Sequence, residues 1–220
     1  MDGNGRWAIA RGLARIAGHR EGVEAVGRVV EAAPECGVGI LTLFAFSSDN
    51  WRRPTEEVQA LMLLFGAYLA GETPRCVEQG VRLEVIGRRD RLDGSLRDAI
   101  AAAEEATAAG NRLRLRLAVD YSARDSIVET VRRLRAPSLE ALEEAMGPPV
   151  DLLIRTGGER RLSDFLLWES AYAELVFTRT MWPDFGASDL RAAVREFHSR
   201  ERRFGMVPSP LAPLREAWLD

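Results

Sequence analysis

The sequence has 220 residues, 46% of them hydrophobic, and a formal net charge of −3. This length suits one α/β domain with a sizeable core, and a mildly acidic chain lacks the basic face of a general nucleic-acid binder. All 30 basic residues are arginine, which excludes a Walker-type lysine and a Schiff-base lysine. Two cysteines and two histidines are too few for a disulfide framework or a His-rich zinc site. Because no apolar run reaches membrane-spanning length and no secretory signal precedes Asp2, we expect a cytoplasmic protein.

Hydrophobic periodicity predicts helices and strands that alternate along the chain. The helix over 59–70 should be disturbed near Gly71 and Pro74, and the strand over 112–117 alternates so cleanly that one of its faces should be exposed. Repeated βα units predict a single α/β domain with a largely parallel central sheet flanked by helices. The expected elements are helices over 19–35, 59–70, 93–109, 122–135, 138–146 and 188–203, and strands over 39–46, 81–87, 112–117, 150–154 and 174–178.

Several polar residues follow the predicted strands. Ligands of such sheets bind at the carboxyl ends of the strands, and Asp2, Ser47, Asp120 and Arg155 fall at or just after such ends. We therefore expect these four residues to lie near one another.

Two segments carry the residue types of anion sites. Arg155-Thr-Gly-Gly-Glu-Arg-Arg-Leu-Ser163 combines arginines with a Gly-Gly turn, and Asp2-Gly-Asn-Gly-Arg-Trp7 adds a carboxylate. Guanidinium forks match phosphate oxygens two at a time, and glycine N–H groups can approach an anion closely. Since Mg²⁺ prefers one or two carboxylates together with substrate phosphates, these segments predict two phosphorylated substrates and a divalent cation.

Each feature is also compatible with a structural role. Asp2 and its glycines suit an ordinary turn, His19 suits a helix start, and Glu174 suits a solvated strand edge. The apolar residues over 59–70 are typical of core packing. Trp51 stands in a polar loop where exposure is costly, so we expect it to pack on a ligand or close a cleft.

The order and spacing of the motifs resemble those of the cis-prenyltransferases, the family of undecaprenyl diphosphate synthase-like isoprenyl transferases. The resemblance covers residues 1–205 as one domain and leaves 206–220 as a Pro-rich tail that is loose or packed on a partner. The matching segments are Met1-Asp-Gly-Asn-Gly-Arg-Trp-Ala, Arg15 with Gly18-His19, Leu43-Phe-Ala-Phe-Ser-Ser-Asp-Asn-Trp-Arg-Arg-Pro54, Asp151-Leu-Leu-Ile-Arg-Thr-Gly-Gly-Glu159, Ala171-Tyr-Ala-Glu-Leu175 and Trp182-Pro-Asp-Phe185.

The resemblance implies a Mg²⁺-dependent enzyme that condenses isopentenyl diphosphate with an allylic diphosphate. The products would be diphosphate and a Z-polyprenyl diphosphate, undecaprenyl-like or shorter. By resemblance, Asp2 and Asn50 are catalytic, and Asp2 and Glu174 hold the metal. The residues that the resemblance assigns to substrate binding are Gly3, Asn4, Gly5, Arg6, Trp7, Arg15, His19, Ser47, Trp51, Arg53, Arg155, Arg161 and Ser163.

The resemblance assigns these residues to two different substrates. The allylic diphosphate would lie among the residues from Gly3 to His19, and isopentenyl diphosphate would lie at Arg155, Arg161 and Ser163. Ser47 and Asn50 would handle the proton that the second substrate loses. An apolar tunnel for the growing product would run between the helix over 59–70 and Phe44-Ala45-Phe46.

The family also implies a homodimer and a product that can associate with a membrane. We expect the dimer surface to include Trp182-Pro-Asp-Phe185 and the Pro-rich tail. In the family an apolar strand precedes the Asp2 loop. We therefore expect this first strand to be missing from the sequence and to be supplied by roughly 15–30 upstream residues.

Two departures from the family pattern bear on substrate and product length. Asp120-Tyr-Ser-Ala-Arg124 replaces Asn-Tyr-Gly-Gly-Arg, and Glu169 replaces a glutamine. The alternatives are a non-catalytic or regulatory subunit of a prenyltransferase, a short-chain or branching prenyl diphosphate synthase, and an unrelated phosphate-binding α/β hydrolase. The last would release phosphate without forming a carbon–carbon bond.

Overall fold

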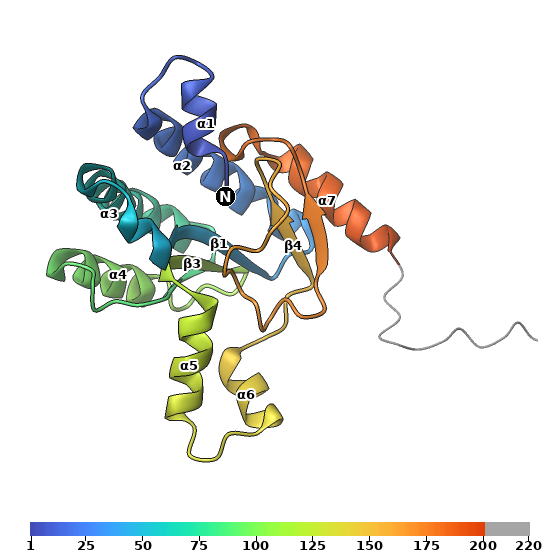
Figure 1. Cartoon of the computed structure of the whole chain (residues 1–220). Coiled ribbons are helices and arrows are strands. Elements are labelled where there is room, and N and C mark those ends of the chain that lie inside the picture. Colours follow the sequence, from blue (N-terminus) through green and yellow to red (C-terminus); the bar gives the residue numbers. More distant parts are fainter. Residues whose placement is uncertain (201–220) are drawn as a thin grey trace, which may run out of the picture.

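The computed structural model describes residues 1–200, so the end of the expected domain and the Pro-rich tail lie outside the described part. Helices and strands alternate along the chain, as the sequence predicts (Figure 1). The helices are α1 (Asn4–Ile9), α2 (Arg15–Ala32), α3 (Thr55–Glu78), α4 (Gly94–Ala106), α5 (Ala123–Arg133), α6 (Leu139–Met146) and α7 (Ala187–Ser199). The strands are β1 (Ile40–Ser47), β2 (Val81–Ile86), β3 (Leu113–Tyr121), β4 (Leu152–Arg155) and β5 (Glu174–Phe177), and short 3-10 turns η1 (Pro34–Cys36), η2 (Ser48–Arg52) and η3 (Trp182–Asp184) lie between elements.

All strand pairings among the described residues are parallel, but they form two sheets. One has the order β1-β3-β2 and the other is the pair β4-β5. Helices α2, α3 and α4 cover one side of the strands, α7 lies on the other, and α5 and α6 project away from the rest (Figure 1). The α/β fold with parallel strands between helices is confirmed.

Strand β3 is central in its sheet and largely buried on both faces. The prediction that one of its faces is exposed is wrong, because helices cover one face and the residues of β4 lie across the cavity from the other. The arginines that alternate with leucines along β3 form ion pairs with the neighbouring strand. Arg114 and Arg116 both approach Glu84 of β2, with N–O distances of 2.8 Å and 3.5 Å.

Helix α3 continues through the two positions that were expected to disturb it. Pro74 lies inside the helix and lacks the N–H that would bond to a carbonyl one turn earlier. The Thr73 hydroxyl donates to the Leu69 carbonyl at 2.6 Å in this stretch. The segment Asn4–Ile9 also forms a helix, where we expected a loop.

A cavity of about 600 Å³ separates the two sheets and is lined by residues of both β1 and β4. The strand that we expected before Asp2 stays a prediction. None of the helices within residues 1–200 combines the length and hydropathy that a membrane crossing requires.

Candidate active site

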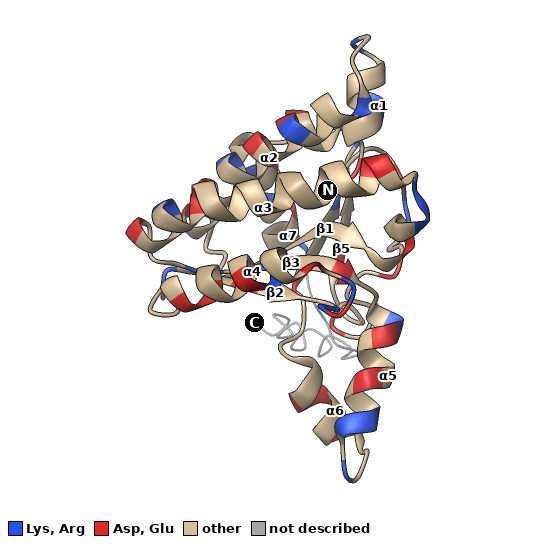
Figure 2. Cartoon of the chain, turned by 90° about the vertical axis from the view of Figure 1, so that its left-hand side faces the viewer, with Lys and Arg blue, Asp and Glu red and all other residues tan. Residues whose placement is uncertain are grey.

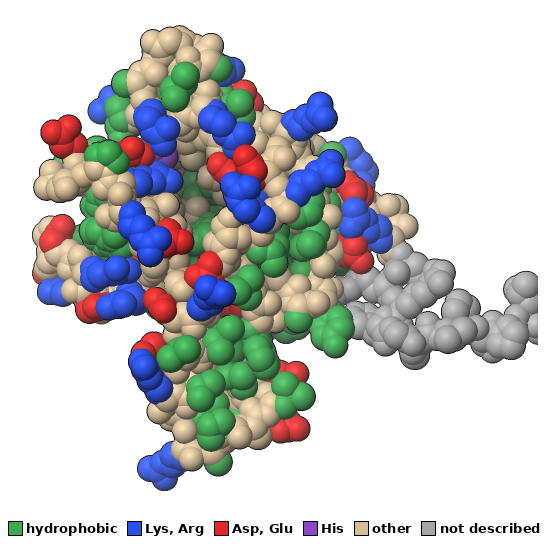
Figure 3. All heavy atoms as spheres, viewed as in Figure 1, with side chains coloured by type: hydrophobic (Ala, Val, Ile, Leu, Met, Phe, Trp, Pro, Cys, Tyr) green, Lys and Arg blue, Asp and Glu red, His purple; other side chains and the backbone are tan. Residues whose placement is uncertain are grey.

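A cavity of about 790 Å³ lies where β1 and β4 end, beside α1 and the first turns of α2 (Figure 3). It brings together Asp2, Ser47 and Arg155, as the carboxyl-end prediction requires, but Asp120 does not line it. Of the predicted site residues, Asp2, Gly3, Asn4, Gly5, Arg6, Arg15, His19, Ser47, Asn50, Arg53, Arg155, Arg161 and Ser163 line it, whereas Trp7, Trp51 and Glu174 do not.

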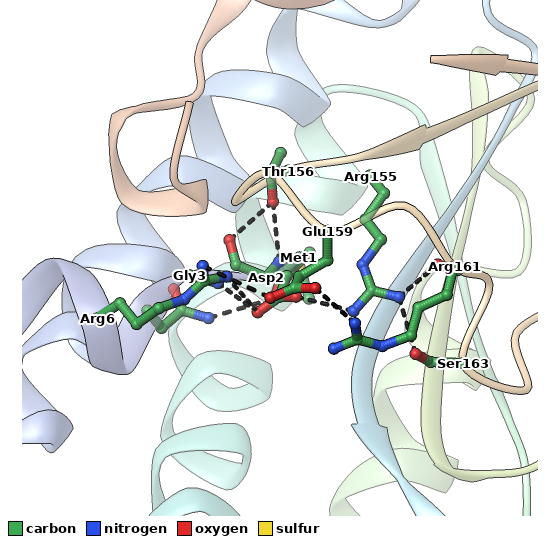
Figure 4. A network of polar contacts seen from close by, with 10 residues as sticks. Met1, Asp2, Gly3, Arg6, Arg155, Thr156, Glu159, Arg161 and Ser163 are labelled. Carbon is green, nitrogen blue, oxygen red and sulfur yellow. Dashed lines mark hydrogen bonds and ion pairs between the residues drawn. The ribbon is translucent and has the colours of Figure 1, made fainter. Parts of the chain in front are cut away.

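Asp2 lies at the centre of a network of polar contacts (Figure 4). Its backbone is fixed by Thr156, whose hydroxyl accepts from the Asp2 N–H and donates to the Asp2 carbonyl, both at 2.8 Å. Its carboxylate accepts from the N–H of Gly3 at 2.7 Å and from Arg155 at 2.9 Å, and Arg6 approaches within 3.5 Å. Burial raises the pKa of Asp2, but the hydrogen bond and charge of Arg155, the Gly3 N–H and Arg6 outweigh it and lower that pKa below its usual value. The carboxylate is therefore ionised near neutral pH.

Glycines allow the two anion-site segments to approach each other. Gly157 has a φ of 81°, and a Cβ there would lie 2.8 Å from an Arg6 nitrogen and 3.1 Å from the Asp2 backbone. Gly3 has a φ of 106°, and a Cβ there would lie 2.9 Å from Met181. A side chain at Gly157 would separate the Asp2 loop from the loop after β4, and one at Gly3 would push that loop away from the segment before η3.

Arg155 joins the Asp2 loop to the segment after β4. Besides its bond to Asp2, it donates to the Ser163 hydroxyl at 2.8 Å and to the Arg161 carbonyl. Its side chain is only 14% exposed, whereas that of Arg161 is 62% exposed and pairs with Glu159. The segment therefore offers one fixed guanidinium and one that can turn toward a ligand.

A second charge cluster on the cavity wall centres on Glu57, which the sequence analysis missed. Its carboxylate lies 3.1 Å from Arg53, 3.6 Å from Arg15 and 4.0 Å from Nε2 of His19. Burial, together with the charges of Arg53 and Arg15, lowers the pKa of His19 to about 4 despite the opposing charge of Glu57. His19 is thus neutral near neutral pH. The spacing of Arg53 and Glu57, one helical turn apart, was the available signal.

Asn50 reaches the cavity from the turn η2 that follows β1. Its side-chain oxygen accepts from the Ser47 N–H at 3.1 Å, which caps the turn. Trp51 belongs to the same turn but packs inward, with its ring 5.3 Å from that of Phe46. Trp51 does not line the cavity and its partly buried ring packs against the core, so a role in covering the site or packing on a ligand stays a prediction.

Trp7 turns away from the cavity. Its indole N–H donates to Asp184 at 2.7 Å, and the Arg11 guanidinium lies 4.1 Å from its ring centre. These contacts make Trp7 part of the packing between α1 and η3.

Glu174 is also remote from Asp2. Strand β5 runs parallel to β4, and Glu174 is opposite Leu152 at the amino end of that pair, whereas Arg155 and Asp2 meet at the carboxyl end. Arg200 donates to the Glu174 carboxylate at 2.7 Å. Within this chain the two carboxylates do not share an ion, contrary to our expectation.

The Asp2 carboxylate nevertheless suits a magnesium ion. No group of three or more His, Cys, Asp or Glu side chains converges within residues 1–200. Asp2 is ionised, lines the cavity and lies beside arginines that would bring diphosphate oxygens to it. One carboxylate with substrate phosphates is a donor set that Mg²⁺ accepts.

A second, apolar cavity of about 100 Å³ lies between α2, α3 and the strands β1 and β3. His19, Ala45 and Leu61 line both this cavity and the polar one, so the two adjoin. The apolar lining comes from the helix and strand that were expected to form a tunnel.

Comparisons with known proteins agree over nearly the whole described chain. A family model described as putative undecaprenyl diphosphate synthase matches residues 1–205. Isoprenyl transferase 1 of Bradyrhizobium diazoefficiens is 59% identical over 213 residues, which cover 93% of this chain and 87% of the relative. The ditrans,polycis-undecaprenyl-diphosphate synthase of Pseudomonas aeruginosa, described as (2E,6E)-farnesyl-diphosphate specific, is 46% identical over 220 residues, which cover 93% and 88%.

Solved structures show the same relationship. The lavandulyl diphosphate synthase of Lavandula x intermedia, in complex with dimethylallyl diphosphate, has a TM-score of 0.89 and 34% identity, covering 94% of this chain and 95% of that chain. A probable undecaprenyl diphosphate synthase of Campylobacter jejuni has a TM-score of 0.79 and 33% identity, covering 84% and 92%. The chain therefore belongs to the undecaprenyl diphosphate synthase family and is a prenyltransferase.

Proposed function

We propose that the chain condenses isopentenyl diphosphate with an allylic diphosphate in a Mg²⁺-dependent cis-prenyl transfer. The observation that carries this proposal is the cavity that Arg6, Arg15, Arg53, Arg155 and Arg161 line together with the Asp2 carboxylate, next to an apolar cavity. The arginines suit two diphosphates, and the apolar lining suits a hydrocarbon tail.

In this reaction a carbon–carbon bond forms at C1 of the allylic substrate while the C1–O bond breaks, and its electron pair leaves with diphosphate. A proton then leaves the added unit, and the new Z double bond remains. When bound at Asp2, Mg²⁺ supplies electrostatic stabilisation of the diphosphate charge that develops. Guanidinium groups held in place before the reaction add to that stabilisation without reorganising.

We assign the allylic diphosphate to the wall formed by Gly3, the start of α1 up to Arg6, Arg15 and His19. Glu57 holds Arg15 and Arg53 in place before the substrate arrives. Isopentenyl diphosphate is assigned to Arg155, Arg161 and Ser163, where Arg155 is already bonded to Ser163.

We assign the proton step to Ser47 and Asn50. Both line the cavity, and the bond between the Ser47 N–H and the Asn50 side chain fixes the amide. Both are uncharged and neither is a base, so the proton that they relay ends on an oxygen of the released diphosphate.

A short or branched product is the second candidate. The likeness to a lavandulyl diphosphate synthase and the small volume of the apolar cavity, about 100 Å³, favour it over a long chain. An undecaprenyl-like product would require the lining side chains to move apart.

The test is to incubate the purified chain with isopentenyl diphosphate, Mg²⁺ and C5, C10 or C15 allylic diphosphates. The alcohols obtained after dephosphorylation are then identified by mass spectrometry. Products longer than the starter by whole C5 units support prenyl transfer, and their length decides between the two candidates. Free phosphate without a longer product, or no turnover without a second subunit, would contradict the proposal.

A further inference from the structure

Asp120 is a fully buried carboxylate that does not line the catalytic cavity. It is the penultimate residue of β3, and its side chain is 0% exposed. Its φ of 50° is uncommon for a residue other than glycine. A buried charge at a strained backbone position requires specific partners.

Arg91 is the charged partner. Its Nε donates to one Asp120 carboxylate oxygen at 2.9 Å, and its Nη2 donates to the other. This two-point pairing fixes the plane of the guanidinium as well as its position. The Arg91 side chain is 35% exposed and crosses from the loop after β2 to the end of β3.

The pair also holds the turn η2 at two points. The Ser48 hydroxyl contacts the Asp120 carboxylate at 3.2 Å and its carbonyl oxygen at 3.3 Å. The Arg91 guanidinium lies 5.4 Å from the ring centre of Trp51. Between Ser48 and Trp51 in the chain stands Asn50, which lines the cavity.

We infer that the buried Asp120–Arg91 pair positions the turn η2 and thereby places Asn50 in the catalytic cavity. Asp120 and Arg91 act through η2 and are positioning residues. The role of Asn50 in turnover rests on the proposed function, whereas the anchoring of η2 does not.

The experiment measures kcat, KM, thermal melting and hydrogen exchange of residues 47–53 in Asp120→Asn. Asparagine is the residue of the family pattern at this position, but in this chain it removes the charge that fixes Arg91 while keeping the shape and an acceptor for Ser48. We expect kcat to fall at least ~10-fold, since a misplacement of about 1 Å can cost ~10²-fold in rate. The KM for isopentenyl diphosphate should change less than ~2-fold, because Arg155 and Arg161 lie on another segment. Exchange in 47–53 should become faster.

The matched control is Glu104→Gln, which weakens a comparable pair away from the cavity. Glu104 accepts from Arg89 at 2.7 Å and from the Val85 N–H at 2.8 Å, and Arg89 belongs to the same loop as Arg91. This variant should lower the melting temperature while leaving kcat and exchange in 47–53 unchanged. An equal loss of kcat in Glu104→Gln would show that Asp120→Asn acts only through stability, which would overturn the inference.

Ser48→Ala keeps the inference testable if Asp120→Asn does not fold. It removes only the hydroxyl link and leaves the ion pair intact, so exchange in 47–53 should rise and kcat should fall ~3-fold or more. Unchanged exchange in 47–53 would overturn the inference. If the unaltered chain has no prenyl-transfer activity, the proposed function fails, and the exchange measurements still decide whether the pair anchors η2.

Discussion

Arg161 and Arg155 carry the same charge but are held very differently. Arg155 is mostly buried and bonded to Asp2 and Ser163, whereas Arg161 is exposed and, among residues 1–200, has Glu159 as its charged partner. We therefore expect Arg155 to organise the site and Arg161 to be the guanidinium that reaches isopentenyl diphosphate.

Replacing Arg161 with lysine should mainly raise the KM for isopentenyl diphosphate. An ammonium group keeps the charge but cannot form the two-point contact of a guanidinium, so we expect an increase of ~10-fold, about 1.4 kcal/mol. Steady-state kinetics measure this. The neighbouring Arg160 is exposed and does not line the cavity, so Arg160→Lys is the control. Equal KM values in the two variants would assign the phosphate contact to another residue.

His19 should make folding stability depend on pH. Its pKa is lowered from 6.5 to about 4, mainly by burial, so the folded chain holds it neutral where the unfolded chain protonates it. The resulting stabilisation is complete above pH 6.5 and is lost as the pH falls from 6.5 to 4, by up to ~3 kcal/mol. We expect the melting temperature of His19→Asn to fall less over this range than that of the unaltered chain. The exposed His198 provides the control His198→Asn, which should behave like the unaltered chain. The same slope in all three proteins would contradict a buried neutral His19.

Most cavity residues were assigned from the resemblance of their motifs to the family, and the predicted strand ends indicated that Asp2, Ser47 and Arg155 meet. The direction in which each side chain points could not be predicted from the sequence. Trp7 and Trp51 stand in the right segments, but which face of a short turn meets the cavity depends on Asp184 and Phe46, which are distant in the sequence. The assignment of Glu174 to the metal was wrong for a similar reason. The register of β4 and β5 places Glu174 at the amino end of the pair, whereas Asp2 lies at the carboxyl end.

A bulge in β1 determines which side chain of that strand faces the apolar cavity. The pairing of β1 with β3 skips Ala45, because Phe44 pairs with Ala118 and Phe46 with Val119. Such an extra residue redirects a side chain, and bulges are common beside active sites. Ala45 lines both cavities at the point where they adjoin.

Ala45→Leu should shorten the product. The larger side chain fills space at the junction of the cavities, where a growing tail would pass. Mass spectrometry of the dephosphorylated products measures the chain length. Leu63 lies on the outer face of α3 and is 76% exposed, so Leu63→Ala should leave the products unchanged. An unaltered distribution in Ala45→Leu would reject this path for the tail.

The positions of strands and helices followed from the sequence because apolar periodicity reports burial. The same periodicity predicted an exposed face for β3, which was wrong. It reflects the polarity of Arg114 and Arg116 but not their pairing with Glu84 on the neighbouring strand. Pro74 likewise predicted a disturbed helix, yet α3 continues to Glu78. For β3, a contact with the neighbouring strand decided the outcome.

For the whole molecule, the surface differs from the one that we expected to form a dimer. Trp182 and Phe185 are 5% and 3% exposed, and the Trp182 indole donates to the Gly22 carbonyl at 2.8 Å. Acidic and basic residues are interspersed over α2, α3 and α4 (Figure 2). Apolar side chains instead gather on the projecting hairpin of α5 and α6 (Figure 3), where Val128 and Leu139 are exposed.

We expect a homodimer that covers this hairpin, because an apolar surface of this kind marks an interaction site. Leu139 is 59% exposed, and Leu139→Glu should shift the molecular mass in light scattering from dimer to monomer. Leu63→Glu places the same charge at an exposed leucine on α3 and should stay dimeric. A monomeric unaltered chain, or a dimer that tolerates Leu139→Glu, would contradict this surface.

We propose that one cavity, organised by Asp2, carries out cis-prenyl transfer. The most direct measurement is the geometry of the new double bond by NMR, on product made from isopentenyl diphosphate and an allylic diphosphate with Mg²⁺. The unaltered chain should give Z bonds, and Asp2→Ala should remain folded with kcat lowered at least ~10²-fold, the scale of losing one preorganised electrostatic contact. Products with E bonds, no carbon–carbon bond formation, or near-normal turnover of Asp2→Ala would contradict the account.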